Sequence, residues 1–266
     1  MRLTLPRGLV RTLQRAVIEF DLLAPGDRVL VGLSGGKDST FLLYALSVFV
    51  EHLPFHVEIA AFTVDLGFKK TDEMDWSSLE ELCKDLNVSY HVQRVELAED
   101  ILNHPNQTPC SVCAYFRRAI IHNYANNHGY NKVAFAHHYD DAVETFLMSI
   151  LYSGQVYTFL PKTYLDRTGV TVIRPLVYIR EKEIKSFIKK LGIRLIPSSC
   201  SLDGYTKRAE VKDLLKELRK KNKNVLAHIA AAMRDGRRSQ LWAPELTKSE
   251  MREKSQKFWY RGENNK

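Results

Sequence analysis

Apolar and polar positions along the chain follow two alternating patterns. Short apolar runs rich in β-branched residues, such as 28–33 and 57–67, are typical of buried parallel strands. Longer segments with apolar residues three or four positions apart predict helices between these runs. The expected strands are 28–33, 57–67, 89–97, 131–137 and 171–176, and the expected helices are 39–50, 75–88, 113–126, 141–152 and 180–192, after an opening amphipathic helix.

Regular alternation of strand and helix predicts an α/β fold: a doubly wound, parallel, five-stranded sheet with helices on both faces. The pattern changes near residue 197, after which two helices are expected, 207–223 and 225–233, before a polar tail. The sequence therefore predicts three parts. These are an N-terminal helix at 1–27, a sheet domain at 28–195, and a C-terminal helical segment with its tail at 196–266.

Composition narrows the class of protein. The 39 Lys and Arg exceed the 31 Asp and Glu by eight charges, which favours a polyanionic partner. No apolar run reaches the length of a membrane helix, so a cytoplasmic protein is expected, although the basic opening segment also resembles a mitochondrial presequence. Four cysteines in such a chain favour metal binding or redox chemistry over a disulfide framework.

The segment SGGKDS, at 34–39, fills the first turn between strand and helix. In a doubly wound sheet this turn binds phosphates through backbone N–H groups and a helix N-terminus. Its spacing fits neither the Walker A loop nor G-x-G-x-x-G. Gly35 and Gly36 allow close approach, Lys37 supplies a positive charge, and Ser39 is expected to cap the helix. A simple glycine turn is the alternative.

Further polar residues are expected at the same edge of the sheet. Asp65 ends the second strand, where it can reach a ribose or Mg²⁺, and HHYDD at 137–141 follows the fourth. Asp140 and Asp141 are candidate Mg²⁺ ligands, and Asp141 is equally a candidate helix N-cap. His137 and its neighbour are candidates for hydrogen bonding. Arg174 is a candidate phosphate ligand, or a surface ion pair.

Three cysteines form a candidate metal site. Cys110 and Cys113 are two residues apart at the start of a helix, and Cys200 lies in a later loop. Cys83 has the spacing of a core residue and is expected to be buried. Three thiolates leave one iron of a cubane cluster open, whereas zinc would need a histidine or water as its fourth ligand. The residues alone leave both metals open.

The loop resembles the signature S-G-G-x-D-S of the PP-loop ATP pyrophosphatases, which is matched at Ser34, Gly35, Gly36, Asp38 and Ser39. This resemblance implies cleavage of ATP between its α- and β-phosphates. Within that superfamily, CSVCAYFRR, HHYDD, VIRPL, REKEI and IPSSC followed by KR resemble the tRNA 2-thiocytidine synthetase family. That likeness implies a [4Fe-4S] cluster on Cys110, Cys113 and Cys200.

The resemblance also implies a reaction. ATP with Mg²⁺ would adenylate the C2 oxygen of a pyrimidine in tRNA, expected to be a cytidine of the anticodon loop, and sulfur would displace AMP. The sulfur would arrive as sulfide at the cluster or as a cysteine persulfide. A cysteine desulfurase or another sulfur donor and a homodimer are further expectations. Catalytic roles are expected for the cysteine triad, Lys37 and Asp38.

The remaining assignments concern the two ligands. Arg117, Arg118, Lys207 and Arg208 are expected to contact tRNA. Two alternatives stay open: an adenylating enzyme for uridine or a small molecule with structural zinc on the triad, and a nucleotide-binding metal sensor without turnover. The residues expected to bind ATP are Ser34, Gly35, Gly36, Lys37, Asp38, Ser39, Asp65, His137, Asp140, Asp141 and Arg174.

Overall fold

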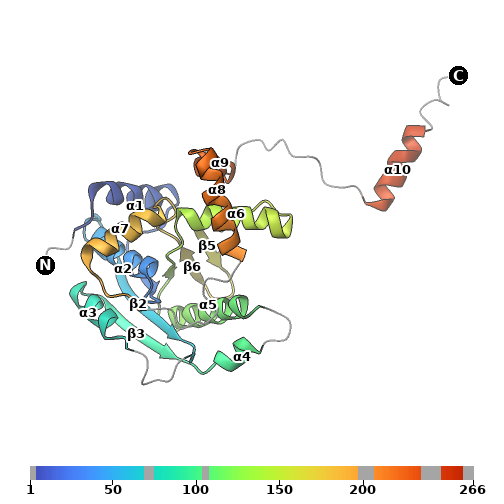
Figure 1. The fold of residues 1–266 in the computed structure, drawn as a ribbon. Helices are drawn as coiled ribbons and strands as arrows, with labels where there is room; N and C mark the ends of the chain where they lie inside the picture. The colour runs from blue at the N-terminus through green and yellow to red at the C-terminus, as the bar shows by residue number, and fades with distance from the viewer. Residues whose placement is uncertain (1–3, 69–74, 104–107, 197–206, 235–246, 260–266) are drawn as a thin grey trace. The chain divides into compact units, whose positions relative to one another are not determined.

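A six-stranded sheet is the centre of the molecule in the computed structural model, which describes residues 4–68, 75–103, 108–196, 207–234 and 247–259. The strand order is β3-β2-β1-β4-β6-β5, and every neighbouring pair is parallel except β5 and β6. Strands β2, β3, β5 and β6 are labelled in Figure 1. The α/β fold class is confirmed. The strands are β1 (Arg28–Gly32), β2 (Glu58–Asp65), β3 (Ser89–Arg94), β4 (Lys132–Ala134), β5 (Lys162–Leu165) and β6 (Val170–Ile173).

The strand order reverses between β1 and β4. From β1 the chain builds outward through β2 to β3, and then returns to place β4 on the other side of β1. The centre of the sheet is held in register, with Leu30 opposite both Ala60 and Val133. Loops leaving the carboxyl ends of two strands at such a reversal diverge to opposite faces, which opens a crevice between them. The loops after β1 and β4 therefore bound the ligand site of this fold.

Helices cover both faces of the sheet. The first apolar cluster joins α1 (Arg7–Glu19), α2 (Lys37–Val50), α3 (Ser77–Asp85) and α7 (Glu181–Leu191) to one face. The second joins α4 (Ala98–Leu102) and α5 (Pro109–Asn127) to the other. Buried residues occupy nearly every position of α2, because this helix lies between the sheet and its neighbours α1 and α7.

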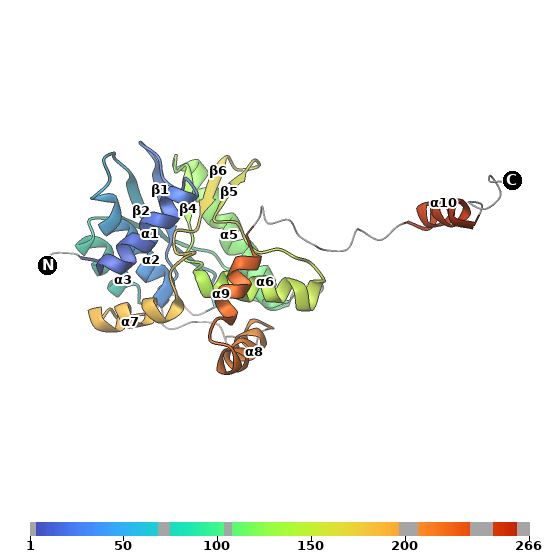
Figure 2. The ribbon, with the colours of Figure 1, turned by 90° about the horizontal axis from the view of Figure 1, so that it is seen from above.

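The helices α8 (Lys207–Lys221) and α9 (Val225–Ala232) pack on α6 (Tyr139–Ser153), and the three group together in Figure 2. Val143 of α6 and Val211, Leu215 and Leu226 form this third apolar cluster. The first compact unit accordingly runs from Met1 to Met233. It includes both the opening helix and these helices.

The second compact unit, Arg234–Lys266, contains α10 (Lys248–Trp259). This helix starts with a reciprocal pair of bonds, because the Glu250 carboxylate accepts from the backbone N–H of Thr247 while the Thr247 hydroxyl accepts from that of Glu250. The sequence pattern had indicated only a polar tail here. Among the described helices of both units, none has the length and apolarity to cross a membrane.

The expected number of strands was wrong by one. The additional strand is β5, which pairs antiparallel with β6 through a hairpin at one edge of the sheet. Its residues alternate between exposed and half-buried, so it lacks the continuous apolar run that identified the other strands. The short helix α4 also lies in a segment that was expected to be a loop.

Candidate active site

The glycine loop connects β1 to α2 and is closed by its own serines. The Ser39 hydroxyl donates to the Gly36 carbonyl (3.1 Å), accepts from the Ser34 backbone N–H (3.1 Å) and lies 3.0 Å from the Ser34 hydroxyl. Gly36, not Ser39, is the N-cap of α2, and no side chain bonds to the first turn from that position. The expected capping role of Ser39 is therefore wrong. The first N–H groups of α2 remain available to an anion.

Gly35 brings a distant segment against this loop. Its φ of +79° is in the left-handed region that favours glycine. The backbone N–H of Ile196 donates to the Gly35 carbonyl at 3.0 Å, and the Ile196 Cβ would lie 2.8 Å from a Cβ added at Gly35. The chain that leads toward Cys200 is thereby fixed on the glycine loop at its last described residue.

A cavity of about 270 Å³ opens beside the glycine loop, in the crevice at the strand reversal. Its walls come from the ends of β1, β2 and β4, from the middle of α5 and from the first turn of α6. One part is apolar and the other carries charged side chains, as a site for a nucleotide requires. The lining residues are Gly32, Leu33, Ser34, Asp38, Ser39, Phe62, Val64, Arg117, Arg118, Ile121, Phe135, Ala136, His137 and Asp141.

Lys37 is held at the start of α2 by two carboxylates. Its Nζ lies 2.8 Å from Asp38 and 3.1 Å from Glu181, which begins α7. Burial by itself would lower the pKa of Lys37. Hydrogen bonds from its ammonium to Asp38 and Glu181 raise the pKa by more than burial lowers it, so the net shift is upward. Glu181 also pairs with Lys185 and Lys212, at 3.0 and 3.5 Å. It therefore keeps cationic partners when Lys37 turns toward a phosphate.

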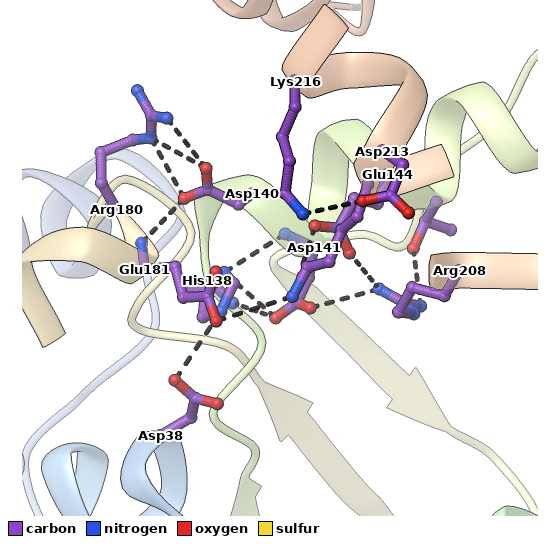
Figure 3. A network of polar contacts seen from close by, with 12 residues as sticks. Asp38, His138, Asp140, Asp141, Glu144, Arg180, Glu181, Arg208, Asp213 and Lys216 are labelled. Atoms are coloured by element: carbon purple, nitrogen blue, oxygen red, sulfur yellow. Dashed lines mark hydrogen bonds and ion pairs between the residues drawn. The ribbon is translucent and has the colours of Figure 1, made fainter. Parts of the chain in front are cut away.

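The motif after β4 forms the N-terminus of α6 (Figure 3). His138 is the N-cap: its Nδ1 accepts from the Asp141 N–H at 3.2 Å, while the Asp141 carboxylate accepts from the His138 N–H at 2.9 Å. His138 Nε2 lies 3.7 Å from Asp38 Oδ1, a buried oxygen without a hydrogen bond. Asp141 stabilises the helix start from within the first turn, whereas the sequence suggested the N-cap position itself.

Asp140 points away from the cavity toward α7. Its carboxylate accepts two hydrogen bonds from Arg180 Nε and one from Arg180 Nη2, the shortest at 2.8 Å, and a fourth from the Glu181 N–H at 2.8 Å. Although burial opposes the shift, these bonds lower the pKa of Asp140. The structure therefore does not bring Asp140 to the cavity as a Mg²⁺ ligand, and instead uses it to fix the start of α7.

Helix α8 reaches the same network through two cations. Arg208 Nη1 lies 3.2 Å from both Asp141 and the almost fully buried Glu144 (Figure 3). Lys212 lies 3.8 Å from Glu144. Burial raises the pKa of Glu144 to about 7 in spite of both cations. Arg208, expected to contact tRNA, is thus a link between α8 and the carboxylates of α6. Lys207 instead pairs with the exposed Glu210 at 3.0 Å.

Asp65 and Arg174, also expected to bind ATP, lie outside the cavity lining, as do Gly35, Gly36 and Lys37 of the glycine loop. Asp65 ends β2 as expected, but its carboxylate bonds to Arg94 at 2.8 Å and to the Gly67 N–H at 3.0 Å. Arg174 follows β6 and donates to the Leu160 carbonyl at 2.6 Å. His137 does line the cavity, and burial together with nearby arginines lowers its pKa to about 4, so it is a neutral imidazole.

The cysteine pair occupies the first two turns of α5, which starts at Pro109, four residues earlier than expected. Cys110 is exposed, Cys113 is half-buried, and both are free thiols. Their spacing places both sulfurs toward one side of the helix N-terminus, where negative ligands are stabilised. Cys200 lies outside the described residues, and the described chain holds no group of three metal-ligating side chains. Cys83 is buried, as expected, and burial raises its thiol pKa to about 12.

Arg117 and Arg118, one turn after Cys113, face the cavity from α5. The Arg117 Nε is buried without a hydrogen-bond partner in the described chain. Arg118 donates to the Ala114 carbonyl at 3.0 Å, a neutral acceptor, and neither arginine forms an ion pair with a described carboxylate. Two uncompensated guanidinium groups beside a cavity provide a site for a polyanionic ligand.

Comparison with known proteins places this site in a family. The sequence profile of the PP-loop domain matches residues 9–218. A tRNA-cytidine(32) 2-sulfurtransferase of Geobacter metallireducens is 34% identical over 82% of this chain and 86% of its own length. One from Coxiella burnetii is 34% identical over 90% of this chain and 94% of its own. The chain belongs to the PP-loop family of tRNA-cytidine(32) 2-sulfurtransferases.

A solved structure agrees with this fold. The U34-tRNA thiolase NcsA from Methanococcus maripaludis, solved with its [4Fe-4S] cluster, superposes with a TM-score of 0.68 at 23% identity, covering 85% of this chain and 77% of that one. At this identity the likeness concerns the fold alone. It shows that the arrangement of a PP-loop sheet with its covering helices is shared.

The sequence did not predict the long-range ion-pair partners that hold Lys37, Asp140 and Asp65 of this PP-loop protein in position. Glu181 and Arg180 were seen only as part of a helix start, yet they hold Lys37 and Asp140. Arg94, which neutralises Asp65, lies on a strand whose pattern carried no chemistry. The sequence did contain a signal for Glu181. The motif REKEI places this acid at the first position of α7, and acidic side chains are stabilised at helix N-termini.

Proposed function

We propose that the protein is an ATP-dependent tRNA 2-sulfurtransferase acting on cytidine 32. Family membership supports the reaction class. The observation that carries it to this chain is that the uncapped α2 N-terminus, which lines the cavity with Asp38 and Ser39, faces the same cavity as Arg117. Lys37 lies in the same first turn of α2. These groups suit a triphosphate at one end and a polyanionic acceptor at the other.

The described residues divide the first half-reaction between them. The N–H groups of α2 and the ammonium of Lys37 bind the β- and γ-phosphates and stabilise the departing pyrophosphate. Apolar side chains of the cavity, Phe62, Val64 and Phe135 among them, exclude water and contact the adenine or the target base. The C2 oxygen of the cytidine then attacks the α-phosphate, and AMP becomes a better leaving group than oxide.

Magnesium is assigned to the oxygens that face the cavity. Asp38 has a buried carboxylate oxygen without a hydrogen bond, and Asp141 lines the same wall. Oxygen ligands of this kind, together with phosphate oxygens, suit Mg²⁺. Asp140 is saturated by Arg180 and is left out of this assignment. The ion would offset the negative charge of the leaving pyrophosphate.

The two described cysteines fit the iron–sulfur cofactor that the family resemblance implies. Cys110 and Cys113 present two free, accessible thiols from one helix N-terminus, and we propose that Cys200 is the third ligand. Both chain ends flanking the segment of Cys200 are fixed near the cavity, Ile196 on Gly35 and Arg208 on Asp141. A bound [4Fe-4S] cluster with an open iron would supply a site for sulfur. A sulfur donor protein and a homodimer remain predictions.

The test uses protein that has been purified anaerobically and whose iron–sulfur cluster has been reconstituted. Incubation with unmodified tRNA, ATP, Mg²⁺ and sulfide should yield one 2-thiocytidine, one AMP and one pyrophosphate per turnover, measured by nucleoside mass spectrometry and phosphate assays. Lys37→Ala should lower this rate by at least about 100-fold through loss of transition-state stabilisation. Formation of 2-thiouridine, thiolation with zinc alone, or ATP cleavage without a thiolated base would contradict the proposal.

A further inference from the structure

Three arginines and one histidine lie between α5 and the β5–β6 hairpin, at the edge of the cavity. They come from two turns of α5, from the hairpin turn and from the end of β6. Among the charged groups acting on His122, the leading ones are all arginines. We call this group the α5–β6 basic cluster; it consists of Arg118, His122, Arg167 and Arg174.

The arginines of this cluster lack counter-ions in the described chain. By contrast, Arg28, Arg180 and Arg208 each meet a carboxylate at 3.2 Å or less. No described carboxylate forms an ion pair with any arginine of the cluster. Arg118 and Arg167 are exposed, whereas Arg174 is half-buried. Because a desolvated guanidinium without an anion is unfavourable, Arg174 is the member that would gain most from an anionic ligand.

Arg174 shows this most clearly. Its guanidinium lies 5.2 Å from the centre of the Phe159 ring. Among the described residues it bonds only to neutral oxygens, the Leu160 carbonyl at 2.6 Å and the Thr163 hydroxyl at 3.5 Å, and its buried Nε has no partner there. Burial and the neighbouring Arg118 lower the pKa of Arg174 to about 10. The planar group is thus oriented in advance, with donor capacity left over.

His122 adds a neutral donor to the same place. It lies one turn after Arg118 on α5, and its Nε2 is buried without a hydrogen bond. Burial, aided by three arginines, lowers its pKa to about 4, so the ring is uncharged at neutral pH. A neutral imidazole beside three guanidinium groups can donate to an oxyanion without adding to their mutual repulsion.

The position of the cluster separates it from the nucleotide cavity. Of its members, only Arg118 lines that cavity, whereas Arg167 is exposed in the turn between β5 and β6. A chain of ring contacts joins the two places: His137 of the cavity wall packs on Phe159 at 4.9 Å, and Arg174 lies over the same ring. A ligand that reaches both must leave the cavity and continue across α5 and β6, as a polymer does.

We propose that the α5–β6 basic cluster binds backbone phosphates of the substrate RNA next to the nucleotide that enters the cavity. The proposal rests on the tRNA sulfurtransferase function given above and names the surface along which the RNA lies. It assigns Arg174 to RNA rather than to the phosphates of ATP, the role expected from the sequence. Phosphate contacts of this kind fix position without reading bases.

The experiment measures binding of a tRNA transcript with cytidine at position 32 and, separately, of ATP, to the full-length protein at several salt concentrations. Arg167→Gln, Arg174→Gln and the double variant are compared with Arg11→Gln, which removes an exposed charge from α1. Each cluster variant should weaken tRNA binding roughly tenfold and reduce the slope of log affinity against log salt by about 0.7 to 0.9, leaving the ATP Kd unchanged.

Different results overturn different statements. If the cluster variants weaken ATP binding and leave the tRNA salt slope intact, the arginines serve ATP and the RNA assignment is wrong. If neither ligand responds, the cluster is not a ligand site. If the wild-type protein binds no tRNA, the proposed function itself fails. Arg167 is exposed and forms no described hydrogen bond or ion pair, so its variant keeps the test valid even if Arg174→Gln does not fold.

Discussion

Replacing Gly35 by alanine tests how tightly the glycine loop is built against Ile196. The new side chain would adopt a φ of +79°, which costs about 1 to 2 kcal/mol for a residue with a Cβ. Its Cβ would also lie 2.8 Å from the Cβ of Ile196, an overpacked contact that typically costs about 1 to 3 kcal/mol. Gly35→Ala should therefore lower the free energy of unfolding by about 2 to 5 kcal/mol.

The control is the adjacent glycine. Gly36 has a φ of −76°, and its added Cβ would meet only the Ser34 hydroxyl at 3.5 Å, an ordinary contact. Gly36→Ala should cost less than about 1 kcal/mol, the scale of an N-cap change. Thermal unfolding distinguishes the two variants, since about 2 to 5 kcal/mol corresponds to roughly 4 to 20 °C in a unit of this size.

A double-mutant cycle separates the two contributions to the Gly35 effect. In an Ile196→Gly background the Cβ that makes the 2.8 Å contact is absent and only the backbone strain remains, so Gly35→Ala should cost about 1 to 2 kcal/mol there. A cost of Gly35→Ala below about 1 kcal/mol in the wild-type background, or no coupling with Ile196, would refute the reasoning. ATP affinity should fall with Gly35→Ala, because the loop that presents the α2 N-terminus must shift.

Three further predictions follow from the site. Asp140→Asn should lower the free energy of unfolding by about 1 to 3 kcal/mol, because its bonds to Arg180 are lost, and should leave Mg²⁺-dependent ATP binding in place. Asp141→Asn should weaken that binding, which calorimetry can measure. The reverse pattern would contradict the Mg²⁺ assignment. In metal-free native protein, iodoacetamide should label Cys110 and Cys113 well before the buried Cys83, as peptide mass spectrometry can show; equal rates would be inconsistent with the structure. Burial depresses the pKa of His122 to about 4, so below pH 6.5 the unfolded state binds more protons than the folded state, and the free energy of unfolding should fall as pH drops from 6.5 to 4. His122→Gln should make this fall shallower in urea titrations at each pH. An unchanged profile would contradict the role given to His122.

The sheet and its ligand edge were predictable because both depend on local patterns. Buried parallel strands give continuous apolar runs, and a glycine turn between strand and helix identifies the phosphate site. The hairpin strand β5 was not predictable in this way, since its residues alternate weakly and it gains its place only by pairing with β6. A strand defined by its partner leaves little trace in its own sequence.

The roles of individual carboxylates were harder to predict than their positions. Asp65, Asp140 and Asp141 all lie at the ends of strands or the starts of helices, as expected. Which of them faces the cavity depends on cations that are distant in the chain, Arg94 and Arg180 for the first two. Sequence patterns give the edge of the sheet on which a side chain lies, but not the long-range ion pair that decides its direction.

The attachment of α8 to the site has a consequence for the order in which the protein becomes active during synthesis. The glycine loop and α2 are among the first segments to emerge, whereas Arg208, which completes the network at Asp141, follows about 170 residues later. At typical elongation rates this delay is roughly 10 to 30 s. During that interval the nascent chain contains the glycine loop but not yet α8, the helix whose Arg208 pairs with Asp141. An adenylating enzyme arranged in this way completes its active site only when nearly all of its catalytic unit has been made.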